Sequence, residues 1–164
     1  MYRNPVYPTS YPWGLFYLYQ NGPADDVHIS GFMHSMPQAP AKHGFAINPR
    51  RVNWRDKESC DRNRDHFNPT GENHGQMDGS PSHVGDLWPV ITDSFGSAYY
   101  YQHPNRPTFY GPNHIYRRSM TIYEKPDDFG TQDTDESMMW GSSGRPIACC
   151  NIQGYRIWRP YPWY

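Results

Sequence analysis

The stretch HFNPTGENHGQMDGSPSHVGD, from His66 to Asp86, carries three histidines and an aspartate at the spacing H-x7-H-x8-H-x2-D. Three imidazole nitrogens and one carboxylate oxygen form a complete tetrahedral ligand set for Zn2+. Four protein ligands leave no open position for water or substrate, so the sequence predicts a structural zinc site. Its candidate ligands are His66, His74, His83 and Asp86.

The composition limits the class of protein. A chain of 164 residues is one domain, long enough to bury a core. The formal net charge of −1 gives no reason to expect nucleic acid or an anionic membrane as a partner. The sequence has no run of 18 apolar residues, so it predicts no membrane span. Residues 1–19 lack the basic and then apolar pattern of a signal peptide, although one could already have been removed.

Short alternating segments separated by turn residues predict an all-β protein. The segments 87–92 and 97–102 flank Asp93-Ser94-Phe95-Gly96 and predict a hairpin. Helical periodicity is nearly absent, which favours an antiparallel sandwich or barrel. Two long loops, 49–85 and 124–146, interrupt the pattern, and loops of this length are usually functional or disordered. The predicted strands are 14–20, 27–33, 43–48, 87–92, 97–102, 119–123 and 147–153.

Five blocks of sequence stand out by their order and by the gaps between them: His43–Asn48, His66–Pro69, His83–Leu87, Glu124–Gly130 and Gly144–Cys149. With these blocks the chain resembles the copper/zinc superoxide dismutase family over roughly residues 14–153. The resemblance implies an eight-stranded Greek-key flattened barrel, an immunoglobulin-like sandwich, with a long zinc loop and an electrostatic-type loop. The first strand then comes from about residues 3–7, where prolines suit only an edge strand.

The same resemblance assigns roles around the zinc. His74, His83 and Asp86 match ligands of zinc alone, and His66 matches the histidine that bridges zinc and copper. Asp127 matches the second-shell carboxylate that orients ligands of both metals. Such carboxylates fix imidazole tautomers and raise the basicity of the ligand, so the retained Asp127 fits a working zinc site.

The copper positions implied by the family are largely lost. Ala46, Asn48 and Tyr123 stand where the family has histidines, and only His66 remains. Ala46 has no donor atom, Asn48 has a weak amide oxygen, and a tyrosine phenol has a pKa near 10. We therefore expect a structural Zn2+ and no high-affinity copper. The substrate-guiding arginine of the family is replaced by Pro146, and the neighbouring Arg145 should point elsewhere.

The resemblance also pairs Cys60 with Cys149 in a disulfide. A cross-link closing a loop of about 90 residues stabilises a fold by roughly 4 kcal/mol in the chain-entropy description. Cys150 is left over and faces the opposite side of its strand. It is either a buried free thiol or a partner in an intermolecular disulfide.

Two Pro- and aromatic-rich arms, residues 1–13 and 154–164, flank the dismutase-like barrel of residues 14–153. Tyr11-Pro12-Trp13 in the first arm recurs as Tyr161-Pro162-Trp163 in the second. Such segments favour extended conformations. The arms either pack back on their own barrel or dock onto neighbouring subunits, which produces rings or filaments if the contact is head-to-tail.

The remaining histidines have no ligand spacing. His43 matches a structural position of the family. The others are expected at the surface or in an interface, namely His28, His34, His103 and His114.

These features predict a non-catalytic, zinc-stabilised, dismutase-like protein that is extracellular and has a structural, self-assembling role. One alternative is an enzyme, a divergent dismutase that binds copper through His66, Tyr123 and another donor. Another is a binding module that sequesters metal or pairs with a true copper/zinc superoxide dismutase.

Overall fold

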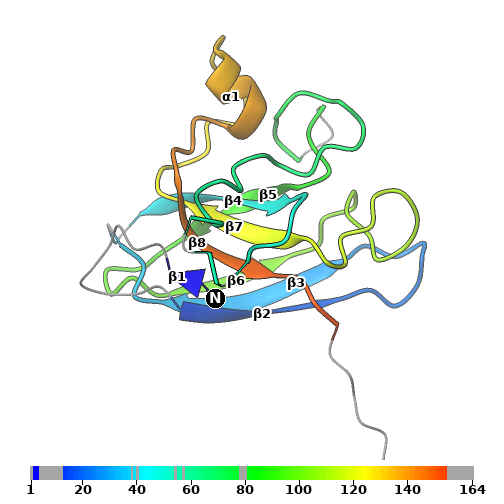
Figure 1. Ribbon diagram of the computed structural model, residues 1–164, viewed down its shortest axis with the longest axis horizontal. Coiled ribbons are helices and arrows are strands. Elements are labelled where there is room, and N and C mark those ends of the chain that lie inside the picture. The colour runs from blue at the N-terminus through cyan, green and yellow to red at the C-terminus, as the bar shows by residue number, and fades with distance from the viewer. Residues whose placement is uncertain are drawn as a thin grey trace, which may run out of the picture.

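A computed structural model of the chain describes residues 2–3, 13–37, 39, 41–53, 55–56, 58–77 and 81–154 (Figure 1). Within these residues the chain forms short strands and one helix of six residues. The elements are β1 (Tyr2–Arg3), β2 (Trp13–Tyr19), β3 (His28–His34), β4 (Lys42–Asn48), β5 (Asp86–Ile91), β6 (Ala98–Gln102), β7 (Ser119–Tyr123), α1 (Asp135–Trp140) and β8 (Pro146–Asn151).

The strands lie in two antiparallel sheets that face each other across one hydrophobic core. One sheet has the order β1-β8-β7-β4-β5 and the other the order β2-β3-β6. Ile29 and Met33 from the smaller sheet pack in the same core cluster as Phe45 and Ile122 from the larger one. The described residues form an open sandwich, and their two sheets are not joined into a closed barrel. The all-β Greek-key sandwich predicted from the sequence is confirmed.

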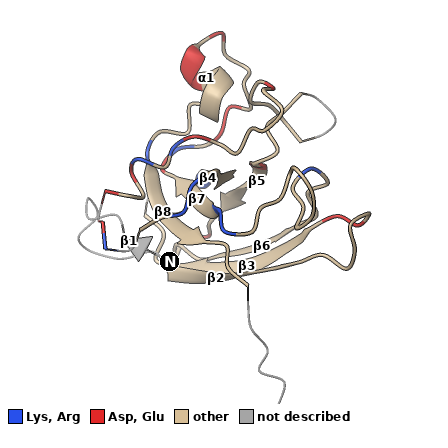
Figure 2. Cartoon of the chain, turned by 45° about the vertical axis from the view of Figure 1, so that its right-hand side comes forward, with Lys and Arg blue, Asp and Glu red and all other residues tan. Residues whose placement is uncertain are grey.

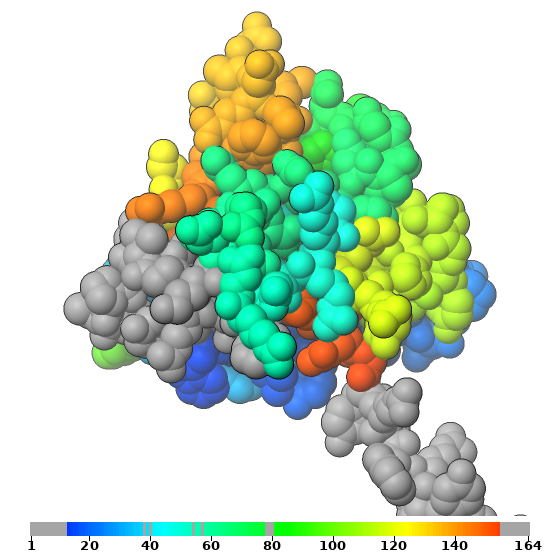
Figure 3. All heavy atoms as spheres, viewed as in Figure 1, coloured from blue at the N-terminus to red at the C-terminus, as the bar shows by residue number. Residues whose placement is uncertain are grey.

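The central strands of the larger sheet are buried on both faces. Every residue of β7, and every residue of β4 after Lys42, is buried. The outer face is covered because the long loops bond to the strands: Gly44 N donates to Lys125 O at 2.8 Å, and Phe67 N donates to Ile47 O at 2.8 Å. The long loops therefore cover the outer face of the larger sheet; the later part of the first loop and the segment with α1 form the upper part of the molecule in Figure 3, whereas the first part of the first loop runs down its front.

The predicted hairpin between residues 87–92 and 97–102 is wrong. β5 pairs with β4, whereas β6 pairs with β3 in the other sheet. Asp93 organises the connecting turn, because its Oδ1 accepts hydrogen bonds from Phe95 N and Ser97 N, each at 2.9 Å. Gly96 has a φ of 73°, which suits glycine. The turn is thus a corner between the sheets.

Two further differences concern short elements. The helix α1 was not predicted, and it forms inside the second long loop between an N-cap at Thr134 and a left-handed C-cap at Gly141. The first strand, Tyr2–Arg3, pairs with Ala148 and Cys149 of β8; of the expected strand residues 3–7, those after Arg3 lie outside the described residues.

Residues 4–12 and 155–164 lie outside the described residues, so the prediction about the two arms stays a prediction. In the described part of the chain, no helix is long and apolar enough to cross a membrane.

Candidate metal centre

Four side chains that the sequence predicted as zinc ligands meet in one buried cluster. His66, His74 and His83 come from the first long loop, and Asp86 is the first residue of β5. Their candidate ligand atoms all lie within 4.8 Å of one another. Asp86 Oδ1 is 2.7 Å from His66 Nδ1, 3.0 Å from His74 Nδ1 and 3.2 Å from His83 Nδ1.

Local backbone contacts bring the loop to Asp86. Its second oxygen, Oδ2, accepts from His83 N at 2.8 Å and from Gly75 N at 3.3 Å. Gly85 lies between Ile47 O and the backbone of Phe67, where a Cβ atom would collide with both. The H-V-G-D spacing therefore lets the loop pack directly on β4 while His83 and Asp86 point to the same place.

Asp127 fixes the orientation of His74. Asp127 Oδ1 lies 2.7 Å from His74 Nε2 and also accepts from Phe129 N at 2.7 Å. Burial alone lowers the pKa of His74, but the nearby carboxylates of Asp127 and then Asp86 raise that pKa to about 10. With Nε2 held by Asp127, His74 presents Nδ1 to Asp86; a carboxylate on the ring nitrogen that does not face the metal is typical of metal-bound histidines.

The cluster fits a zinc site. Among the described residues, Nδ1 of His74 and Nδ1 of His83 are buried and make no hydrogen bond of acceptable geometry, although both lie within 3.2 Å of Asp86 Oδ1. Buried polar atoms without a hydrogen-bond partner destabilise a fold unless water or an ion binds them. Three imidazole nitrogens and a carboxylate oxygen that converge at this distance are the donor set that tetrahedral Zn2+ takes.

A different network occupies the positions expected to hold copper. Tyr123 is fully buried, and its hydroxyl donates to Arg64 O at 2.9 Å and accepts from Asn48 Nδ2 at 2.9 Å. Burial raises the pKa of Tyr123 well above its usual range, so the side chain is a neutral phenol. Its ring centroid is 5.6 Å from that of His66. Ala46, also buried, contributes no polar side-chain atom.

Arg64 connects the two long loops above this network. Its Nη2 donates to Gly144 O at 3.0 Å and lies 3.7 Å from Glu136 Oε1. The guanidinium carbon is 5.0 Å from the centre of the Trp140 ring. Figure 2 shows the acidic first turn of α1 at the far end of the molecule from the smaller sheet. Sequence reasoning missed these contacts, because no pattern links Arg64 to residues more than seventy positions away.

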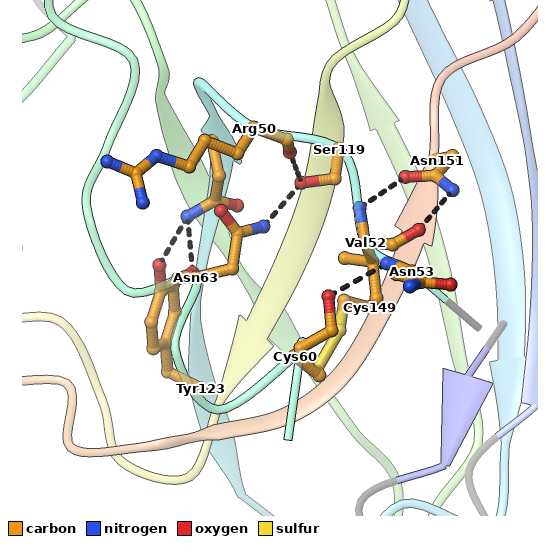
Figure 4. The surroundings of a disulfide bond; sticks show 11 residues. Arg50, Val52, Asn53, Cys60, Asn63, Ser119, Tyr123, Cys149 and Asn151 are labelled. Carbon is orange, nitrogen blue, oxygen red and sulfur yellow. Dashed lines mark hydrogen bonds between the residues drawn. A yellow bond between two sulfur atoms is a disulfide. The ribbon is translucent and has the colours of Figure 1, made fainter. Parts of the chain in front are cut away.

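The predicted disulfide between Cys60 and Cys149 is confirmed, with a Cα–Cα distance of 6.1 Å (Figure 4). Side-chain bonds reinforce it on either side. Val52 N donates to Asn151 Oδ1 at 2.8 Å, and Asn63 Nδ2 donates to Ser119 Oγ at 2.6 Å. The first part of the zinc loop is thereby fastened to β7 and β8.

Cys150 carries a free thiol packed at the edge of the core cluster. Burial raises the pKa of this thiol to about 11.

Arg145 and Pro146 stand at the start of the last strand. Arg145 donates from Nε to Glu124 Oε2 at 3.0 Å, and Pro146 is the first residue of β8.

His43 is buried inside β4, with Nδ1 3.0 Å from Tyr123 O, and burial lowers its pKa. The other four histidines lie apart from the metal cluster. His34 Nδ1 is 2.8 Å from Ser97 Oγ, His28 stacks on Tyr19, and His103 and His114 each contact a tyrosine ring.

The fold and the cluster together define a β-sandwich protein with a disulfide-anchored loop and a buried group of three histidines and one aspartate that fits a metal ion. The family model of copper/zinc superoxide dismutase matches residues 13–152. The chain therefore belongs to the copper/zinc superoxide dismutase family.

Proteins similar to this chain include two Cu-Zn superoxide dismutases and the clock protein EA4. A Cu-Zn superoxide dismutase of Cryptococcus neoformans var. grubii is 31% identical over 140 residues, covering 85% of this chain and 88% of that protein. Cu-Zn superoxide dismutase A of Xenopus laevis is 31% identical over 124 residues, covering 76% and 78%. The crystal structure of the clock protein EA4 superposes with a TM-score of 0.76 and 27% identity, covering 87% of each chain.

Proposed function

We propose that this protein is a non-catalytic member of its family, stabilised by a structural zinc, with a structural and self-associating role outside the cell. The main support for a non-catalytic role comes from the hydrogen bonds of Tyr123. The hydroxyl of Tyr123, at a copper position of the family, is bonded to Asn48 and to the backbone of Arg64.

A copper ion needs several imidazole donors, and the site offers one at most. Asn48 directs its amide nitrogen, a donor group with no metal-binding lone pair, to Tyr123 and to Asn63 O and Asp65 O at 3.0 and 2.9 Å. Ala46 has no side-chain donor atom. His66 is shared with the zinc cluster, where its Nδ1 faces Asp86.

The zinc would be held by His66, His74, His83 and Asp86, with Asp127 as the group that orients His74. Zn2+ has one stable oxidation state, so it supplies structural cross-linking and no electron carrier for dismutation. Bound there, it would join the loop that carries the three histidines to the start of β5. The metal therefore adds to the anchoring provided by the disulfide of Cys60 and Cys149.

The disulfide supports the extracellular location in this proposal. Disulfides persist in oxidising compartments and are rare in the cytosol, where thiols are kept reduced. The Cys60–Cys149 bond closes a separation of 89 residues, which makes it a major constraint on the fold.

A divergent dismutase is the second candidate, because Nε2 of His66 is buried and has no hydrogen-bond partner among the described residues. This nitrogen could bind a copper ion. The other donor required by this alternative is Tyr123, whose proton is engaged with Arg64 O and whose raised pKa opposes phenolate formation. We therefore favour the non-catalytic function.

Metal content and activity test the proposal together. The purified full chain is loaded with zinc and with copper, analysed for bound metal, and assayed for superoxide dismutation. We expect one zinc per chain, no tightly bound copper, and no activity above background. The variant carrying Ala46→His, Asn48→His and Tyr123→His should gain copper, which serves as the positive control. Near-equal copper with copper-dependent turnover in the natural chain would overturn the proposal, and a stable complex with an active dismutase would support a binding module instead.

A further inference from the structure

The outer face of the β2-β3-β6 sheet is covered by exposed aromatic side chains. In Figure 1 this sheet is the layer on the side away from α1 and the two long loops. Alternate residues of β2 and β6 point outward, as their burial patterns show. The outward-pointing large side chains are Trp13, Leu15, Tyr17, Tyr19, Tyr99 and Tyr101, and the aromatic ones are between 51% and 89% exposed. We call this surface the aromatic face.

The strand register makes the aromatic face continuous. Leu15 lies opposite Phe32, which lies opposite Tyr99. One row further along, Tyr17 lies opposite Ser30, which lies opposite Tyr101. Residues directly opposite on neighbouring strands share one face of the sheet, so these rows cross all three strands.

The aromatic face carries no formal charge of its own. The sequences of its three strands are WGLFYLY, HISGFMH and AYYYQ, and none contains Asp, Glu, Lys or Arg. An aromatic sheet that bound nucleic acid would need basic residues for the phosphates. The lack of charge also removes any repulsion between two copies of the same surface.

Several of its side chains already pack on one another. The ring centroid of Trp13 is 5.7 Å from that of Phe32 and 4.8 Å from that of His34. Tyr19 stacks on His28 at 4.4 Å. Side chains held in this way lose less conformational entropy on binding.

The area of the aromatic face suits a protein partner. With side-chain areas of about 150–250 Å2 for aromatic residues, the exposed parts of its Trp and Tyr side chains amount to roughly 650 Å2. The largest apolar patch on a typical monomer is about 300–600 Å2, and a stable dimer buries about 800 Å2 on each partner. Leu15 and the half-buried residues of β3 bring the surface into that range.

We propose that the aromatic face binds a second copy of this chain, so that two three-stranded sheets pack face to face. Two such sheets would stack about 10 Å apart and within about 30° of each other. The contact uses the same surface on both chains, so it closes as a twofold dimer. The inference rests on the self-association in the proposed function, but it involves no residue of the metal centre, so the two can fail separately.

The test places a charge on the aromatic face. The full chain and Tyr99→Arg are compared by sedimentation velocity over a range of concentrations, with Ile91→Arg as the matched control. Tyr99 is 89% exposed, and Ile91 is a 61% exposed strand residue on the other sheet. We expect a dimer for the natural chain and for Ile91→Arg. Tyr99→Arg should weaken dimerisation about 100-fold or more, because the interface would contain the charge twice.

Two further measurements test whether the aromatic face forms the dimer contact. The dimer should persist when residues 155–164 are deleted, and Tyr17, Tyr99 and Tyr101 should be protected from hydroxyl-radical labelling as concentration rises, whereas Tyr110 should not. A chain that is monomeric at high concentration, or a dimer that Tyr99→Arg leaves intact, overturns the proposal. A monomer that binds insoluble polysaccharide through Tyr99 also overturns it, since the face would then be a platform for sugar rings.

Discussion

Asn48 and Tyr123 are bonded to each other on the outer face of the larger sheet, beneath the first long loop, with Asn48 Nδ2 2.9 Å from the Tyr123 hydroxyl across a sequence separation of 75 residues. The pair joins β4 to β7 and also reaches the zinc loop, because the same hydroxyl donates to Arg64 O. Two positions that the sequence resemblance assigns to copper ligands are thus part of the hydrogen bonding that fastens the loop to the sheet.

Tyr123→Phe should lower the free energy of unfolding by about 1–3 kcal/mol, because it leaves Arg64 O without the hydroxyl that donates to it and removes one of the three acceptors of Asn48 Nδ2. Tyr110→Phe, which removes the same atom at a 46% exposed position, should change stability by less than about 0.5 kcal/mol. Denaturant unfolding of both variants measures the difference. Equal stability of Tyr123→Phe and the natural chain would show that the network is dispensable.

Removing zinc with a chelator, or replacing His74 by Ala, should lower the melting temperature by about 10 °C, because metal affinity present only in the folded state adds to stability. Asp127→Asn should keep all four ligands and weaken zinc binding about 10- to 100-fold, since it alters the partner of His74 Nε2. Zinc titration against a competing chelator measures this loss, with the exposed Asp133→Asn as the control. A melting curve that does not move when zinc leaves would contradict a structural role for the metal.

The sequence was most informative where residues act locally. His83 and Asp86 are close in sequence and lie together in space, and the alternation of apolar with small or polar residues in 27–33 correctly indicated a half-buried strand. The convergence of His66, His74, His83 and Asp86 could be predicted because donor type and spacing are both restricted for a metal site.

Contacts between distant segments could not be predicted in this way. β5 and β6 look like a hairpin because the four residues between them form a good turn, but the choice of pairing partner depends on β3 and β4. The six residues of α1 are too few for a helical period to show, and capping by Thr134 and Gly141 decides the helix. Arg64 was missed since its partners come from the second long loop.

Breaking the disulfide with Cys60→Ser and Cys149→Ser should lower the free energy of unfolding by about 4 kcal/mol, because the unfolded chain regains the freedom of an 89-residue loop. Unfolding of the natural chain in the presence of a reductant should show a similar loss, whereas Cys150→Ala keeps the cross-link and should retain most of the stability. Denaturant midpoints under oxidising and reducing conditions provide the measurement. If reduction leaves the midpoint unchanged, the zinc and the hydrogen bonds alone hold the loop.

Cys150 should react slowly with iodoacetamide at pH 8, because burial raises its pKa to about 11 and the thiolate is the reactive form. An unfolded cysteine has a pKa of about 8.5, so the stability contributed by the protonated thiol is complete below that pH and is lost as pH rises toward 11. The natural chain should therefore lose more stability than Cys150→Ala between pH 8 and pH 10.5. Labelling rates and denaturation at both pH values test this. Rapid labelling of the folded protein at pH 8 would place the thiol at an accessible surface.

Deleting residues 155–164 should reduce the mass of any particle larger than a dimer. This segment reads YRIWRPYPWY and concentrates Tyr, Trp and Arg, the residue types most often found at binding hot spots, while its prolines limit the entropy lost on docking. A segment that docks head-to-tail on the next subunit makes a contact that continues into rings or filaments, whereas the aromatic face closes at two copies. Light scattering of the full chain, of the deletion and of the deletion combined with Tyr99→Arg separates the two contacts. We expect the deletion to leave a dimer and the combined variant to be monomeric. If the deletion leaves a large assembly unchanged, the arm covers only its own subunit and the large assembly depends on another surface.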